Sequence, residues 1–190
     1  MDGTMRSLKF VGLAAAVLAV GLFTVQAPVG HAEGPKGPSY VGSKACKTCH
    51  MGAAKGAIYE AWEKTDHAQA LAKLPGDKQK DPTCLPCHTT GFGKPGGYDP
   101  AAATAANLAG VGCESCHGPG SDYKAMNVMK DKAASVAKGL IEPNEKSCQG
   151  CHNSTMPKDC WKGGAEAPKF VFAESVKKVE HHLPKKPAAK

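Results

Sequence analysis

The chain contains few of the residues from which a conventional protein core is built. Phe, Trp and Tyr make up 6% of its 190 residues, whereas Gly and Pro number 22 and 14. Aromatic side chains supply much of the apolar area of a core, and Gly and Pro interrupt helices and strands. This composition argues against a large core of side chains alone and predicts that another group supplies apolar surface.

Cysteine and histidine occur in a pattern that could provide that surface. The pentapeptide Cys-x-x-Cys-His appears four times, at 46–50, 84–88, 113–117 and 148–152. This is the attachment signature of c-type haem, in which two thiols add to the porphyrin vinyl groups and the imidazole becomes the proximal iron ligand. The sequence therefore predicts four haem c groups, with thioether bonds from Cys46, Cys49, Cys84, Cys87, Cys113, Cys116, Cys148 and Cys151 and proximal ligands His50, His88, His117 and His152.

Other uses of paired cysteines explain less of the pattern. With 8 His in 190 residues, chance would place a His after a given Cys-x-x-Cys only about once in 24. A zinc ribbon uses such pairs two at a time and needs no His directly after the second Cys. A disulfide framework does not require the same two-residue gap four times. Haem attachment explains all four His.

The first 32 residues are typical of an export signal. Arg6 and Lys9 precede the apolar run 10–25, which is short for a full membrane span. An uncleaved anchor is the alternative, and it would be the chain's only contact with a membrane. We expect a signal peptide at 1–32, a single exported domain at 33–190, and a periplasmic or extracellular location.

The predicted fold is mostly α, with short helices and long loops wrapped around four covalently bound haems and little or no β structure. Four haems in the exported part correspond to about one per 40 residues, so the cofactors would form the core. We therefore expect the haem-free chain to be largely unfolded. Helical composition and end signals favour helices at 53–74, 123–140 and 170–183.

The basic charge is not evidence for nucleic-acid binding. The formal net charge is +7; removal of the signal leaves about +6, and four ferric haems at about −1 each reduce it to about +2. The C-terminal stretch, about 176–190, is predicted to be a solvated tail. Neutralising haem propionates or steering an acidic redox partner are the alternatives. Its basic residues are Lys177, Lys178, Lys185, Lys186 and Lys190.

The second axial ligands are fewer than the haems. Outside the motifs the chain offers His31, His67, His181 and His182, and His31 leaves with the signal. Three distal His then remain for four irons. In the expected last helix, His182 lies nearer the apolar stripe and His181 points away from it. Either the two serve different irons or one of them is a spectator.

The fourth iron could be completed in several ways. Met129 is a candidate distal ligand, although Met at helical spacing also serves in packing. The iron could instead stay five-coordinate, or it could take a His from a neighbouring subunit. The ninth cysteine, Cys160, lies outside the motifs. We expect it to be buried or idle, with iron ligation or an intermolecular disulfide as alternatives.

The chain resembles the multihaem cytochromes of the cytochrome c-554 family. The resemblance covers most of the exported chain and rests on segments that occur in the family's order. These are Trp62-x-x-Thr65-x-His67-Ala68-x-Ala70, the Gly-flanked motif 112–120, the motif 148–153, and the closing Val179-x-His181-x-Leu183-Pro184.

This resemblance implies a mostly helical periplasmic electron carrier with closely stacked haem pairs. It also implies three bis-His haems and a five-coordinate second haem, the one held by Cys84, Cys87 and His88. By position, His67 and His181 would be distal ligands. The sequence departs from the family at 154–168 and in having a His next to His181.

We predict a non-enzymatic electron-transfer protein that relays electrons between redox partner proteins. One alternative is a reductase that acts on a small nitrogen oxide, peroxide or sulfur species at an open iron. The absence of a Cys-x-x-Cys-Lys motif counts against its resembling the pentahaem nitrite reductases. A second alternative is a homo-oligomeric, conducting filament in which a neighbouring subunit supplies the missing distal His.

Overall fold

The computed structural model describes Met1 and residues 37–153, 155–160 and 169–182. The chain separates into two units, Met1–Glu33 and Gly34–Lys190. The expected signal peptide, apart from Met1, and the last residues of the basic C-terminal stretch lie outside the described residues. No described helix is both long and apolar enough to cross a bilayer.

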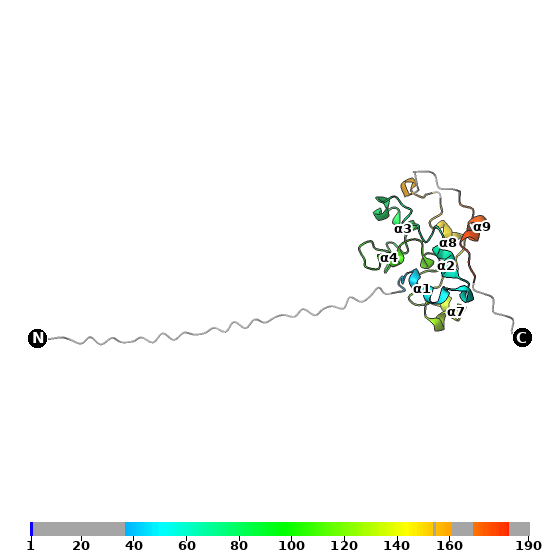
Figure 1. Cartoon of the computed structure of the whole chain (residues 1–190), viewed down its shortest axis with the longest axis horizontal. Helices are drawn as coiled ribbons and strands as arrows, with labels where there is room; N and C mark the ends of the chain where they lie inside the picture. The colour runs from blue at the N-terminus through cyan, green and yellow to red at the C-terminus, as the bar shows by residue number, and fades with distance from the viewer. Residues whose placement is uncertain (2–36, 154, 161–168, 183–190) are drawn as a thin grey trace. The chain divides into compact units, whose positions relative to one another are not determined.

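The second unit consists of short helices joined by loops (Figure 1). The α-helices are α1 Ser43–His50, α2 Ile58–Glu63, α3 Leu85–His88, α4 Ala105–Leu108, α5 Cys113–His117, α6 Met126–Met129, α7 Lys132–Ala137, α8 Glu145–Gln149 and α9 Phe172–Ser175. Short 3-10 helices are η1 Ala53–Lys55, η2 Lys78–Lys80, η3 Lys158–Cys160 and η5 Val176–Lys178. Over the described ranges, β structure is limited to one bridge between Thr89 and Ala109. This architecture agrees with the predicted fold class.

The helix expected at 53–74 is much shorter in the structure. Helical residues are confined to η1 and α2, because Gly56 and Ala57 between them have φ values of 83° and 48°, which an α-helix does not accommodate. After α2 the Thr65 hydroxyl donates to the Trp62 carbonyl at 2.7 Å, and turns follow. The Ala-rich composition therefore overstated the helix.

The helix expected at 123–140 is divided into α6 and α7. The backbone is extended at Ala125 and again at Asp131, so the helix starts twice. The Asp131 carboxylate caps α7 by accepting the N–H of Ala134 at 3.1 Å. The expected end near Gly139 is observed, since this glycine has a φ of 98° after the last helical turn.

The helix expected at 170–183 ends earlier than predicted. It comprises α9 and η5, and Val179 then leaves the helical conformation with a φ of −130°. His181 and His182 therefore follow the helix instead of closing it. The expectation that helical periodicity turns His182 toward the apolar stripe was wrong for this reason.

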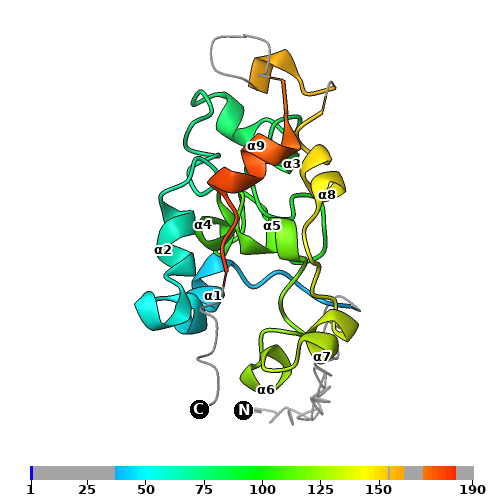
Figure 2. The same ribbon diagram turned by 90° about the vertical axis from the view of Figure 1, so that its right-hand side faces the viewer.

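Two small apolar clusters hold the loops together. One contains Leu85, Tyr98 and Leu108, with Tyr40 and Phe92 packed against it. The other consists of Leu74, Cys84 and Cys160, with Leu71 against it. Figure 2 shows α6 and α7 at one end of this unit, away from α3. α1 packs against α2, α4 and α5, so the first motif is near the third.

A buried carboxylate joins the beginning of the unit to the third motif. Glu114 is 2% exposed and accepts backbone N–H groups of Val41, Gly42 and Gly120 at 2.9, 2.7 and 2.6 Å. Such donors compensate the desolvation of the charge. They fix the segment before α1 against α5.

Candidate haem-binding sites

Each Cys-x-x-Cys-His motif overlaps a short helix. The motif 46–50 lies in α1, 84–88 begins at the residue that precedes α3, 113–117 forms α5, and 148–152 begins in α8. Side chains at positions i, i+3 and i+4 of a helix project from one face. Each turn therefore directs two thiols and an imidazole to one side, which is the arrangement that covalent haem attachment needs.

Local sequence signals account for these short helices. α8 begins with a capping box in which Asn144 accepts the N–H of Ser147 at 3.3 Å and donates its own N–H to the Ser147 hydroxyl at 3.2 Å. α3 carries Pro86 in its first turn, where a missing N–H costs no hydrogen bond. α5 ends at Gly118, whose φ of 77° favours glycine.

Cysteines of different motifs lie close together. Cys46 hydrogen-bonds to Cys113, which raises the pKa of Cys46 and lowers the pKa of Cys113 to about 7. The same contact between Cys151 and Cys87 raises the pKa of Cys151 and lowers the pKa of Cys87 to about 7. Desolvation raises the pKa of the half-buried Cys116 thiol, and the nearby Cys148 adds to this effect.

These contacts define neighbouring motifs. The first motif is beside the third, the second is beside the fourth, and the third and fourth are close enough to interact. The four attachment sites thus follow one another in the order first, third, fourth, second.

Two of the motif imidazoles are oriented as metal ligands. The Nδ1 of His88 donates to the carbonyl of Ala70 at 2.7 Å, and that of His117 donates to the carbonyl of Ile141 at 3.0 Å. A carbonyl can only accept, so each Nδ1 carries the proton and Nε2 has a free lone pair. A hydrogen bond of this kind fixes the ring orientation and tautomer of a ligating histidine. The residues of these motifs fit the proximal role.

Partial burial also favours the neutral form of four candidate ligands. Desolvation lowers the pKa values of His50, His67, His117 and His152 below the usual histidine value. Iron is bound by the neutral imidazole. The Nδ1 of His50 is buried without a hydrogen-bond partner, so the first motif lacks the carbonyl contact that orients the imidazoles of the second and third.

Two of the three expected distal histidines face a motif histidine. The rings of His67 and His152 have centroids 6.0 Å apart, and those of His117 and His181 are 5.9 Å apart. Metal to imidazole-nitrogen bonds of about 2.0 Å on opposite faces of one ion put the ring centroids about 6 Å apart. Both pairs therefore have the spacing of two imidazoles on one iron.

The other distal candidates have no such contact among the described residues. The side chain of His182 is 83% exposed, and its Nε2 lies 3.9 Å from a carboxylate oxygen of Glu180. The sulfur of Met129 accepts the hydroxyl of Ser135 at 3.8 Å within the α6 and α7 hairpin. The structure brings neither side chain to a motif histidine.

Sequence reasoning missed two residues near the motifs. Phe170 stacks on His152 with ring centroids 4.9 Å apart and an interplanar angle of 17°. The buried carboxylate of Glu114 occupies one of the two variable positions of the third motif. Neither residue belongs to a recognisable pattern, because variable motif positions and lone aromatics carry no sequence signal of their own.

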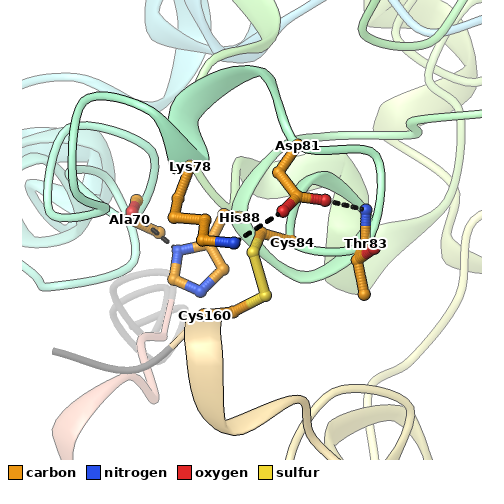
Figure 3. The surroundings of a disulfide bond; sticks show 7 residues. All are labelled: Ala70, Lys78, Asp81, Thr83, Cys84, His88 and Cys160. Carbon is orange, nitrogen blue, oxygen red and sulfur yellow. Dashed lines mark hydrogen bonds and ion pairs between the residues drawn. A yellow bond between two sulfur atoms is a disulfide. The ribbon is translucent and has the colours of Figure 1, made fainter. Parts of the chain in front are cut away.

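The remaining cysteine has a partner that the sequence did not indicate. Cys160 forms a disulfide with Cys84, the first cysteine of the second motif, with the two Cα atoms 5.3 Å apart (Figure 3). Both residues are buried. The other seven cysteines are free thiols. The only sequence signal for this pairing was the odd number of cysteines.

Comparison with known proteins identifies the family. The model of the family "Cytochrome c554 and c-prime" matches residues 45–118. Cytochrome c-554 of Nitrosomonas europaea is 31% identical over 191 aligned positions, which cover 86% of this chain and 77% of that protein. The structure of reduced cytochrome c554 from the same organism matches with a TM-score of 0.57 and 30% identity, over 75% of this chain and 84% of that one.

These matches confirm the predicted resemblance, the multihaem fold of short helices and the haem c cofactor with its iron. The chain therefore belongs to the cytochrome c-554 family, and it is a multihaem electron-transfer cytochrome.

Proposed function

We propose that residues 33–190 form a periplasmic carrier that relays electrons between redox partner proteins. The observation that carries this proposal is the order of the attachment sites, in which each motif lies beside the next. When bound, haem supplies an iron that accepts and releases one electron. In the proposed carrier, each iron lies beside the next along the row that runs from the first motif through the third and fourth to the second.

We also propose the residues that hold each haem. The eight motif cysteines form the thioethers, and His50, His88, His117 and His152 are the proximal ligands. His67 is the distal ligand of the iron held by His152, and His181 is that of the iron held by His117. The two ring spacings near 6 Å support both assignments.

This assignment leaves two irons open, those held by His50 and His88, although desolvation and the nearby His181 and His117 together lower the pKa of His50. His50 and His88 have no second histidine in ring contact among the described residues. This is one open iron more than the family resemblance implied. His182 and Met129 were candidate ligands from the sequence; no contact supports either of them, and we assign neither to an iron.

The relay can be tested by interrupting it. The fully loaded wild-type protein should have the mass of the chain from about Glu33 plus four haems, and should take up four electrons in a coulometric titration. A variant without the third motif cysteines, Cys113→Ala and Cys116→Ala, divides the path. The matched variant Cys46→Ala and Cys49→Ala removes the haem at one end of the path and leaves the other three haems next to one another.

After a pulse of photoreduction, electrons should redistribute more slowly among the remaining haems in the variant that lacks the third motif. The variant that lacks the first motif should redistribute them as fast as the wild type. Equal rates in both variants would contradict the relay order. The absorbance of the three remaining haems checks that each variant is otherwise loaded.

The open irons favour a second candidate function, reduction of a small ligand. An iron with one free face can bind nitric oxide, hydroxylamine or peroxide. Turnover of such a species by the reduced protein, measured with a dithionite-coupled dye assay, would support a reductase. Ligand binding without turnover would support the carrier.

A further inference from the structure

One thiol of the second motif has two competing uses. The proposed haem attachment needs the sulfur of Cys84 as a free thiol, whereas the structure places it in a disulfide with Cys160. A sulfur in a disulfide has no S–H to add to a vinyl group. The thioether and the disulfide at Cys84 are therefore mutually exclusive.

The surroundings of Cys84 favour contact with the segment that carries Cys160. Both cysteines pack with Leu74 in one apolar cluster, and Cys84 is 1% and Cys160 8% exposed. Figure 3 shows Lys78 beside this site, donating to Asp81 at 3.0 Å. The hydrogen bond to Asp81 raises the pKa of Lys78, and the nearby charge of Asp159 adds to this effect. Apolar packing thus holds η3 against the residues before α3, and Asp159 of η3 lies near Lys78.

The cross-link affects one motif only. Cys87, the other thiol of the second motif, is free, as are all six cysteines of the other three motifs. A chain with this disulfide retains both thiols at three attachment sites and one thiol at the fourth.

From this we infer that Cys160 is a redox gate on loading of the second haem site: its disulfide with Cys84 blocks haem attachment there until a dithiol reductant opens it. The inference rests on the proposed attachment of haem at the second motif. It assigns Cys160 a role in maturation of the protein and not in electron transfer.

The disulfide between Cys84 and Cys160 forms and breaks by thiol–disulfide exchange. The gate closes when the thiols of Cys84 and Cys160 exchange with the disulfide of a protein oxidant, which leaves as a dithiol with two electrons and two protons from the pair. It opens when a dithiol reductant attacks one sulfur, forms a mixed disulfide, and resolves it with its second thiol. The reductant leaves as a disulfide, and both cysteines regain their protons. Because both sulfurs are buried, the reductant reaches them only when the segment 155–160 moves away.

The test compares haem loading of the full chain with and without a thiol reductant. Wild type, Cys160→Ser and Met156→Ala are exported by a host with c-type cytochrome maturation, with or without dithiothreitol in the medium. Intact mass counts the haems on each chain, and peptide mass locates any empty motif and any disulfide. Met156→Ala is the matched control because Met156 is a half-buried residue of the same segment and the thiol of Cys160 is kept.

Without dithiothreitol, we expect a wild-type and Met156→Ala species that lacks one haem, always at 84–88, with Cys84 and Cys160 in one disulfide-linked peptide. Dithiothreitol should restore the fourth haem to both. Cys160→Ser should carry four haems under either condition.

Three results would overturn the gate: no three-haem species in the wild type, missing haems spread over several motifs, or the same loss at 84–88 in Cys160→Ser. Absence of haem from all four motifs would instead contradict the proposed function.

Discussion

Glu114 illustrates how a single residue can hold the third motif in place. Its carboxylate accepts N–H groups from Val41, Gly42 and Gly120. Replacing one carboxylate oxygen by an NH₂ group would leave some of these donors facing another donor. Leaving buried polar groups unsatisfied costs about 1–3 kcal/mol.

We therefore expect Glu114→Gln to lower the free energy of unfolding of the haem-loaded protein by about 1–3 kcal/mol in urea denaturation. The control Glu63→Gln alters an exposed residue at the end of α2 and should change stability by less than about 0.5 kcal/mol. Equal stability of the two variants would show that the buried N–H groups find other acceptors.

His67 and His182 offer a matched test of distal ligation. The ring of His67 faces that of His152, whereas His182 is exposed beside Glu180. His67→Gly should convert one haem from low spin to high spin, because the iron loses one of its two imidazoles. His182→Gly should leave the low-spin content unchanged. Ferric electron paramagnetic resonance of the two variants measures this difference, and an unchanged spectrum for His67→Gly would remove this residue from the ligands.

At the scale of elements, Gly110 sets the position of the turn that carries His67. Its φ is +80°, and a Cβ at this position would lie 2.5 Å from the carbonyl oxygen of Ala68 and 3.0 Å from that of His67. The next residue, Val111, donates its N–H to the His67 carbonyl at 2.8 Å and accepts the indole N–H of Trp62 at 3.0 Å. This small network joins the segment after α2 to the one before α5.

A methyl group at Gly110 should therefore displace His67. Gly93→Ala is the matched control, since its φ is +73° and a Cβ there meets no atom within 4 Å. The control should lose about 1–2 kcal/mol of stability from the positive φ alone. Gly110→Ala should lose more and should also raise the high-spin share of the haem signal. Equal losses of stability and unchanged spectra would mean that the backbone around Gly110 accommodates the methyl group without displacing His67.

The sequence was informative about the cofactor and the family, and less so about helix length. The four motifs were located by their spacing, because thioether chemistry fixes that spacing locally. The helix at 53–74 was overestimated because its Ala, Glu and Lys content predicts helix, whereas the left-handed Ala57 divides it and the segment after α2 is held by the contact between Val111 and His67. Composition does not report such contacts between distant segments.

The pairing of ligands was equally beyond the sequence. Counting histidines gave three distal candidates but not their partners. His67 contacts His152, and the second and third motifs lie between these two residues in the sequence. His181 contacts His117 from the segment that follows the last helix, and the sequence predicted a helix there. The disulfide between Cys84 and Cys160 has a sequence separation of 76 residues. Partners at such separations depend on how the loops pack.

At the scale of the whole molecule, the small apolar core makes haem the main source of buried apolar surface. The described buried hydrophobic residues are Tyr59, Ala70, Leu74, Cys84, Leu85, Tyr98, Leu108, Tyr123 and Cys160. A domain of this length usually needs a larger core to offset the entropy of ordering the chain. The loops are long, and six of these nine residues form two small clusters that share the partly buried Leu71.

Removal of the cofactors should therefore abolish cooperative folding. The haem-free chain, produced without its leader in the cytoplasm, should show a gradual change of circular dichroism with urea, whereas the loaded protein should show one sharp transition. The three-haem variant Cys46→Ser and Cys49→Ser is the control, and it should keep a transition at lower urea because only one site is lost. A sharp transition of the haem-free chain would show that the two apolar clusters and the bonds to Glu114 are sufficient to fold it. The haems would then occupy a scaffold that forms without them.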